Sequence, residues 1–219
     1  MAFNKQILRN STLQVQSTLG SDITITGITN ANPAVVSATN SLSDGDIVIL
    51  SGIVGMEKLN GRAARVTSSS GSAFSLEGID TTSTSVWGTY SSAGVANEIS
   101  AWDTFGNVTG IDLPDGAPEN LDTTTIGDES RQTELGHDAS IVGTLSLFSD
   151  PADPGTAEVI SAAQTRAARV FKLTTQKGTV WIWNATSVAG GQGMSAAIGN
   201  VGTGQITMTL PYAAQMFTS

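Results

Sequence analysis

Short stretches of alternating β-branched and polar residues, each closed by a turn, recur along almost the whole chain. The clearest series lies in residues 31–97, where candidate strands at 34–38, 46–51, 61–67 and 73–76 are separated by turns rich in Gly, Asn and Ser. Strands that recur about every ten residues with such turns are typical of small sandwiches and barrels. The sequence therefore predicts a mainly β protein in which residues 31–97 form a unit of their own.

The composition of the 219-residue chain limits its function. Only 13% of the residues are charged and the net charge is −9, which makes nucleic-acid binding unfavourable because phosphate is attracted by Lys and Arg. The chain has no cysteine, which excludes disulfides, thiolate catalysis and Cys-ligated zinc. Apolar runs do not exceed four residues and the first residues lack an apolar leader region, so we expect no membrane span and synthesis in the cytoplasm.

The C-terminal part of the chain contains a predicted strand followed by the one predicted helix. Residues 143–148 alternate as a strand. Asp153 followed by Pro154 is typical of a helix N-terminus, with the aspartate as cap and the proline in the first helical position. The apolar spacing that follows predicts a short helix over residues 156–167.

Two further strands form a predicted hairpin over residues 168–175 and 179–188, with a tight turn between them. Trp181 and Trp183 lie on one face of the second strand, and the other face is also apolar. Both faces should therefore be covered, one of them by a helix or by another subunit. The last strand, residues 205–210, alternates between large apolar and uncharged polar residues, as expected for a wall between a core and water.

Residues 110–139 have a different character. They show no helical or strand period and are rich in Asp, Glu, Thr, Gly and Pro. Structureless loops longer than about 12–15 residues are usually functional or disordered. We therefore predict that this acidic segment has a function of its own or is ordered by a partner.

The residue types that usually carry catalysis are few. His137 is the only histidine, and no Gly-x-Ser-x-Gly elbow supplies a serine for it. The glycines of residues 190–193 lack the Lys-Ser/Thr that a phosphate-binding loop needs. The many carboxylates lie in loops that the sequence does not bring together for glycoside hydrolysis. We predict no catalytic residue, no cofactor site and no enzymatic activity.

Metal and sugar binding have structural alternatives. The acidic turns Asp44-Gly45-Asp46 and Asp150 to Asp153 offer carboxylates to Ca²⁺. Neither turn has the alternate spacing and closing Glu of an EF-hand loop, so a turn and a helix cap are the favoured roles and we predict no metal site. The tryptophans could stack on sugars, but core packing is their commoner role in a strand.

Residues 120–210 carry an ordered series of features. The acidic motifs Leu121-Asp122-Thr123-Thr124, Asp128-Glu129-Ser130-Arg131 and Gly136-His137-Asp138 precede the strand, the helix and the hairpin around Lys177-Gly178. This order resembles the tail tube, or major tail, proteins of bacteriophages with long non-contractile tails (siphophages). The resemblance implies a β-sandwich flanked by a helix and built from residues 1–30 and 98–219.

A second resemblance covers residues 33–80. The motifs Pro33-Ala34-Val35-Val36, Leu42-Ser43-Asp44-Gly45-Asp46 and Leu59-Asn60-Gly61-Arg62 are similar to a small β-barrel module of phage structural proteins. That module is named after a domain of ubiquitin-activating enzymes, and it implies no activity in a chain without cysteine or a nucleotide site. Residues 31–97 would then be an inserted small β-barrel domain that faces outward.

The tail tube resemblance also implies self-assembly. Subunits would form hexameric rings whose sheets join into one barrel, and the rings would stack into a negatively lined conduit for DNA. The expected partners are copies of the chain, the tape measure and other tail proteins, with DNA passing transiently and no membrane involved. Assembly would take place in the host cytoplasm and end in the virion tail.

In such tubes a long loop reaches the next ring, and residues 110–139 are our candidate for that loop. Trp181 and Trp183 are the candidates for packing between subunits. The inter-ring candidates are Asp112, Asp115, Glu119, Asp122, Asp128, Glu129 and Arg131.

A different function class stays open at this point. The chain could instead be a tail-tip or decoration protein that binds the host surface through residues 31–97. That alternative predicts glycan binding through Trp87 or Tyr90 and a monomer or trimer in place of a tube.

Overall fold

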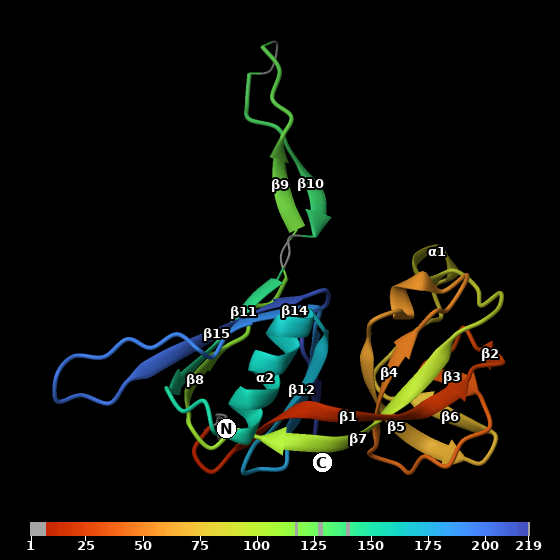
Figure 1. Cartoon of the computed structure of the whole chain (residues 1–219). Helices are drawn as coiled ribbons and strands as arrows, with labels where there is room; N and C mark the ends of the chain where they lie inside the picture. The colour runs from red at the N-terminus through yellow and green to blue at the C-terminus, as the bar shows by residue number, and fades with distance from the viewer. Residues whose placement is uncertain (1–7, 117, 127–128, 139–140, 219) are drawn as a thin grey trace, which may run out of the picture.

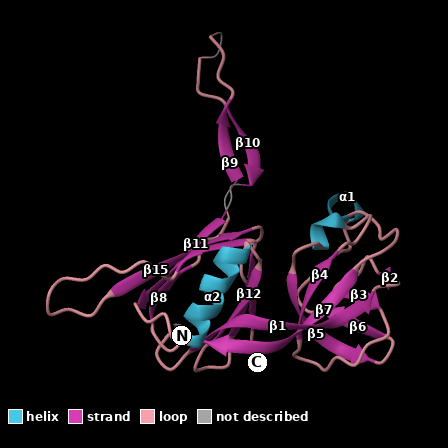
Figure 2. Ribbon diagram, viewed as in Figure 1, coloured by secondary structure: helices cyan, strands magenta, loops and turns pink. Residues whose placement is uncertain are grey.

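The structure, a computed structural model, describes residues 8–116, 118–126, 129–138 and 141–218. In these residues the chain is mainly β, with large antiparallel sheets and two α-helices (Figures 1 and 2). Two groups of strands lie side by side, and a hairpin projects away from them (Figure 1). The prediction of a mainly β protein is confirmed.

The larger sheet has ten strands and extends through both groups. All of its pairings are antiparallel, and it places strands from the two ends of the chain next to one another. Its strands, in spatial order, are β16 (Gln215–Phe217), β13 (Val180–Ala185), β12 (Arg169–Thr174), β1 (Thr12–Thr24), β7 (Val95–Thr104), β4 (Ile47–Ser51), β5 (Ala63–Ser70), β6 (Ala73–Leu76), β3 (Ala34–Ser37) and β2 (Gly27–Ile28).

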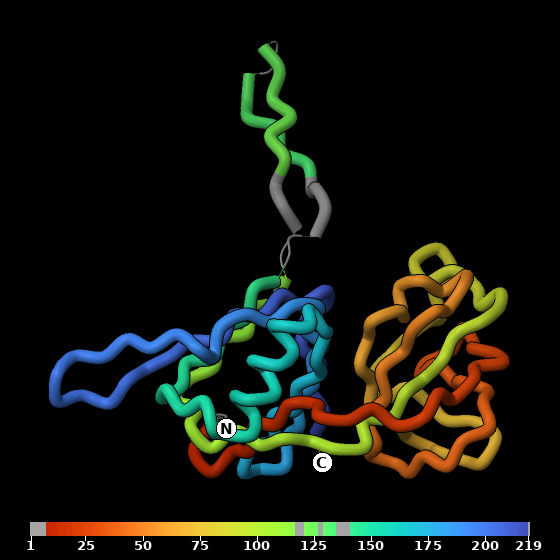
Figure 3. Tube along the Cα trace, in the orientation of Figure 1, coloured from red at the N-terminus to blue at the C-terminus, as the bar shows by residue number. Residues whose placement is uncertain are grey.

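Strands β1 and β7 join the two groups. They pair from Gln14↔Thr104 to Thr24↔Val95, and Figure 3 shows them side by side as they pass from one group to the other. The sequence predicts two short strands in the first 30 residues. The structure instead has one long strand, with register shifts between Gln16 and Asp22 that absorb the change of direction.

The smaller sheet stacks against the C-terminal strands of the larger one. Its inner face buries Leu145, Ile206 and Met208 in one cluster with Phe171 and Trp183. The alternation predicted for the last strand is confirmed, since its even-numbered apolar residues are all buried. The strands, in spatial order, are β14 (Ser187–Gly190), β15 (Thr203–Leu210), β11 (Ile141–Phe148) and β8 (Val108–Asp112).

Helix α2 (Pro154–Thr165) covers this stack at one side (Figure 2). The predicted cap is confirmed, because the Asp153 carboxylate accepts a hydrogen bond of 3.0 Å from the Thr156 amide. Val159 and Ala162 are fully buried. Gly155 lets the first turn approach the body closely, since a Cβ there would lie 2.6 Å from Cγ of Phe105.

A separate cluster of apolar side chains fills the other group of strands. Its buried members all come from residues 25–96. The four strands predicted in this part of the sequence appear as β3, β4, β5 and β6, within a few residues at each end. The prediction of one helix overall is incomplete, because helix α1 (Thr84–Trp87) and a 3-10 turn, η1 (Glu57–Leu59), lie here too. The strand order runs openly from β16 to β2, and the described residues form no assigned closed barrel.

The acidic segment contains strands that its sequence does not predict. β9 (Pro118–Asp122) and β10 (Thr133–Asp138) form a two-stranded antiparallel sheet of their own. The prediction fails because hydrophobic alternation marks only strands that bury one face.

Candidate assembly surfaces

The β9–β10 hairpin, residues 118–138, is here called the arm. Its strands pair with one another, from Thr133↔Asp122 to Asp138↔Pro118, and with no other described strand. Figure 1 shows the arm standing clear of both groups of strands. An isolated two-stranded hairpin is marginally stable in water, so a projecting hairpin of this kind gains from a further surface on which to lie.

The tip of the arm is organised by a hydrogen-bonded turn. The Asp122 carboxylate accepts hydrogen bonds from the amide (3.0 Å) and the hydroxyl (2.5 Å) of Thr124. The Gln132 amide donates to the Thr124 hydroxyl oxygen at 3.0 Å, which ties the two legs together. The bonds from Thr124, and then that from Arg131, hold the pKa of Asp122 below its usual value.

The inter-ring candidates spread along the arm and its base. Asp112 ends β8 and Asp115 follows it in the segment that leads to the arm. Asp122, Glu129 and Arg131 lie at the exposed tip, where Arg131 forms a 3.2 Å ion pair with Asp122. Glu119 belongs to β9, but its side chain is not described, and Asp128 lies outside the described residues. Ile126, which the sequence does not single out, is fully exposed at the tip.

A second projection joins β14 to β15, and its residues 191–202 are here called the Gly-rich loop (Figure 1). Its base is fixed by reciprocal backbone hydrogen bonds of 2.8 and 2.9 Å between Ser195 and Thr203. Met194, just before this base, is 69% exposed, and beyond it Val201 is 67% exposed and Ile198 is fully exposed. A loop of this length with three exposed large apolar side chains is unusual on a monomeric surface.

Among the described residues, neither edge of the smaller sheet pairs with a further strand, and no second layer covers its outer face. Its edge strands are β8 and β14. The outer face carries uncharged polar side chains such as Thr144 and Thr207, which pair across β11 and β15, and Asp112 lies beside Thr144. None of the four strands contains a Lys or Arg. A free strand edge is a template for pairing with another chain.

Comparison with known proteins gives a family. A model described as "Phage tail tube protein, TTP" matches residues 54–213, or 160 of the 219 residues. The chain belongs to the phage tail tube protein family. This family is structural rather than enzymatic, and its members are components of the virion tail.

Other comparisons with this family member are more distant. No curated protein matches its sequence. Among solved structures, it is similar to the cap of the anti-feeding prophage, with 17% identity, a TM-score of 0.35, and coverage of 51% of this chain and 80% of the other. It is also similar to the sheath-tube complex of an extracellular contractile injection system, with 15% identity, a TM-score of 0.35, and coverage of 51% and 81%.

The tryptophans of this tail tube family member are held mostly within the chain. Trp183 is 2% exposed and stacks on Phe171, with ring centroids 5.6 Å apart. On the opposite face of β13, Ile182 packs in a cluster with Ile99 and Phe217. Both faces are covered, as predicted, but the cover comes from the same chain. Trp183 therefore has no exposed surface to offer a neighbour, whereas Trp181 stays half-buried.

The residues considered for other chemistry have structural partners in this family member. Asp44 and Asp46 accept backbone hydrogen bonds of 2.7 Å that fix their turn, and Asp150 accepts one of 3.0 Å from the Ala152 amide. Among the described residues no cluster of metal-ligating side chains occurs. His137 lies in β10, and its side chain is not described.

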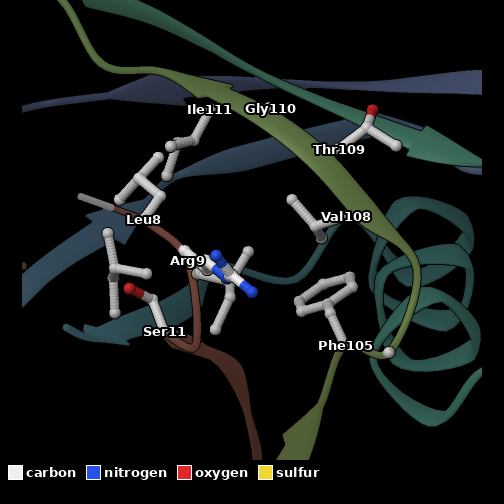
Figure 4. Close-up of a pocket in the computed structure, with 11 residues that line it drawn as sticks. Leu8, Arg9, Ser11, Phe105, Val108, Thr109, Gly110 and Ile111 are labelled. Carbon is white, nitrogen blue, oxygen red and sulfur yellow. The ribbon is translucent and has the colours of Figure 1, made fainter. Parts of the chain in front are cut away.

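One cavity of about 390 Å³ opens beside the free edge of β8 (Figure 4). Its walls are mixed, with the apolar side chains of Leu8, Phe105 and Ile111 around the guanidinium of Arg9. The described residues that line it include no carboxylate and no imidazole. Neither described helix has the length and apolar character needed to cross a membrane.

Proposed function

We propose that the chain is the ring-forming subunit of the tail tube of a phage with a long non-contractile tail. Rings of six copies stack into a conduit through which DNA passes without binding. The observation that carries this proposal, beside the family, is an acidic hairpin whose strands pair with no other described strand of the chain. Assembly in the host cytoplasm would also involve the tape measure and other tail proteins.

The arm is the proposed contact from one ring to the next. Residues 112–138 hold eight acidic side chains and one basic one, a net charge of −7 within a chain of net charge −9. Such a concentration of charge on an exposed hairpin steers association and fixes its register. The inter-ring candidates Asp112, Asp115, Glu119, Asp122, Asp128, Glu129 and Arg131 all belong to this region.

The free edges of β8 and β14 are the proposed contacts within a ring. Pairing β8 of one copy with β14 of the next would extend the smaller sheet into a continuous wall. Its outer face would then line the lumen. A wall without Lys or Arg and with Asp112 as its carboxylate gives DNA phosphates nothing to bind. Trp181 is the remaining tryptophan candidate for a subunit contact.

We assign residues 31–97 to an inserted module of small β-barrel type on the outside of the tube, and residues 1–30 and 98–219 to the tube sandwich. Barrel closure is supported where the chain bends between β1 and β2. The Ile25 amide donates to the Gly94 carbonyl (3.0 Å) and the Thr26 amide donates to the Ser37 carbonyl (2.8 Å). The backbone at the bend is therefore hydrogen-bonded both to the residue before β7 and to the last residue of β3.

Negative-stain electron microscopy of the purified chain tests this function. We expect rings and hollow tubes with outward knobs at high concentration. Replacing residues 117–139 with a short Gly-Ser linker should leave rings but abolish stacking. Replacing residues 82–85, which are all exposed in the outer module, by Gly-Ser-Gly-Ser is the matched control and should leave tubes. Long tubes from the chain without its arm would refute the inter-ring role.

The tail-tip or decoration alternative predicts discrete particles in the same experiment. It depends on Trp87 or Tyr90 being free to stack on a glycan. Both side chains are partly buried against the apolar cluster of residues 25–96, and the Tyr90 hydroxyl donates to the Ile25 carbonyl at 3.0 Å. These contacts favour the tube over the glycan-binding module.

A further inference from the structure

Arg62 is a cation held between two aromatic rings. It follows η1, and its Nε–H donates to the Lys58 carbonyl at 2.8 Å. Its guanidinium carbon lies 3.8 Å from the ring centroid of Tyr212 and 5.1 Å from that of Trp87. The two rings come from distant parts of the sequence, and their contacts with the guanidinium help to fix its position.

No described carboxylate forms an ion pair with Arg62. The other half-buried arginines differ in this respect, because Arg65 pairs with Glu77 and Arg169 pairs with Glu158. Burial lowers the pKa of Arg62 below its usual value, which marks the cost of holding the charge away from water. Arg62 is thus a half-buried cation with no anion partner among the described residues, and a carboxylate from another copy can supply one.

Arg62 faces a cavity of about 400 Å³ that is otherwise built from the chain around Pro211 and from the base of the arm. Gly116 and Ile141, which flank the arm in sequence, line the same cavity. The Gln215 side chain lines it too, and its Oε1 is buried without a hydrogen-bond partner. The cavity therefore offers the Arg62 guanidinium to an incoming segment, which suits a peptide that carries a carboxylate.

The tip of the arm has the complementary chemistry. Glu129 is exposed there and forms no ion pair among the described residues, whereas Asp122 is paired with Arg131. The leg from Gly116 to Ile126 spans about 33 Å when extended. One end of the arm thus starts at the cavity, and the other carries an unpaired carboxylate about one arm length away.

We propose that the Arg62 cavity receives the arm tip of a second copy of this chain, with Glu129 pairing with Arg62. Because each arm starts at one cavity and ends at another, the contact is head-to-tail, and between rings that share one axis it generates a stack of open length. The inference rests on the proposed function, and it names the receptor that the arm would reach in the next ring.

Charge exchange tests this pairing in the full chain. Arg62→Glu and Glu129→Arg should each raise the concentration needed for tube formation, on the order of tenfold or more. The double variant Arg62→Glu/Glu129→Arg should recover most of that loss. Lys172→Gln is the matched control, because it removes another half-buried cation, 4.3 Å from the Trp102 ring centroid, and should leave stacking unchanged.

Cross-linking gives a second measurement that keeps both charges in place. The chain has no cysteine, so Lys58→Cys in one population and Ser130→Cys in another can react with a short bis-maleimide only between copies. We expect the mixed dimer in tubes and not in dilute chains. Tubes formed equally well by Arg62→Glu, or tubes without this cross-link, would overturn the pairing and leave the tube function intact. An unsubstituted chain that forms no rings or tubes would count against the tube function instead.

Discussion

The arm and the Gly-rich loop both project from the body, but they differ in chemistry. Residues 112–138, which include the arm, have a net charge of −7 (eight acidic side chains against one basic), whereas residues 191–202 have no charged residue. The arm is a hydrogen-bonded hairpin with a tied tip. The loop has backbone hydrogen bonds between Ser195 and Thr203 and one turn bond, from Asn200 to Ala197, near its tip. It exposes three large apolar side chains, Met194, Ile198 and Val201.

This difference indicates two kinds of contact in one assembly. A charged hairpin acts at a distance, selects its partner and is screened by salt. Exposed apolar side chains act only on contact, but each contributes more once water is removed from around it. Separate variants of the two projections should therefore separate the specificity of assembly from its strength.

The largest effect should come from the loop. Replacing Met194, Ile198 and Val201 together by serine removes side chains that contribute about 1.5–3 kcal/mol each when fully buried. We expect the critical concentration for tubes, measured by pelleting, to rise by more than about a hundredfold. The unfolding temperature of the free chain should not change, because these side chains are exposed in it.

Val86→Ser is the control for this variant, since Val86 is 49% exposed on helix α1 in the outer module. It should leave the critical concentration unchanged. If the triple serine variant assembled normally, the loop would lie in solvent and the comparison between the two projections would fail.

Salt should have a moderate effect on the critical concentration for tubes, and this effect should depend on the charges of the arm alone. Between 0.1 and 1 M the screening length falls from about 10 to about 3 Å. We expect the critical concentration of the unsubstituted chain to rise several-fold over this range in sedimentation assays. Glu129→Gln should flatten that dependence, whereas the triple serine variant should keep it. An unsubstituted chain insensitive to salt would contradict a charge-directed arm.

The smallest effect concerns pH at the arm tip. The hydrogen bonds from Thr124 lower the pKa of Asp122, so the folded tip favours the carboxylate. The resulting stability is present above the unfolded pKa of about 3.9 and is lost as the pH falls through the lower folded value. Thr124→Val should move the pKa of Asp122 upward in an NMR titration. An unchanged Asp122 titration would contradict this account of the tip.

Much of the fold could be predicted because strands with one buried face alternate between apolar and polar residues in the sequence. The strand at residues 73–76 was predicted with its observed bounds, and the Asp153 cap located helix α2 to within two residues. The arm shows no such alternation, since its sequence has no regular series of apolar residues. Helix α1 was missed because four residues are too few to show a helical period.

The candidate site was predictable only in part. The composition of residues 110–139 singled out the arm, but Arg62 depends on Tyr212 and Trp87, which the sequence does not bring together. The glycines of the Gly-rich loop predict a loop, but the sequence does not predict that its three large apolar side chains are exposed. Exposure is a property of the folded chain, and composition alone does not reveal it.

The position of β1 in the larger sheet affects how the chain folds while the ribosome is still synthesising it. Thr12 pairs with Thr174 at the far end of the chain, so β1 is synthesised well before its partner β12. At about 5–20 residues per second, the delay is roughly 8–30 seconds. Through that interval β1 has a free edge, yet it is protected by its own composition. Its apolar residues never stand side by side, and Gln, Ser, Thr, Gly and Asp separate them. A nascent subunit therefore cannot complete its sheet, or join a growing tail, until its last strands have left the exit tunnel.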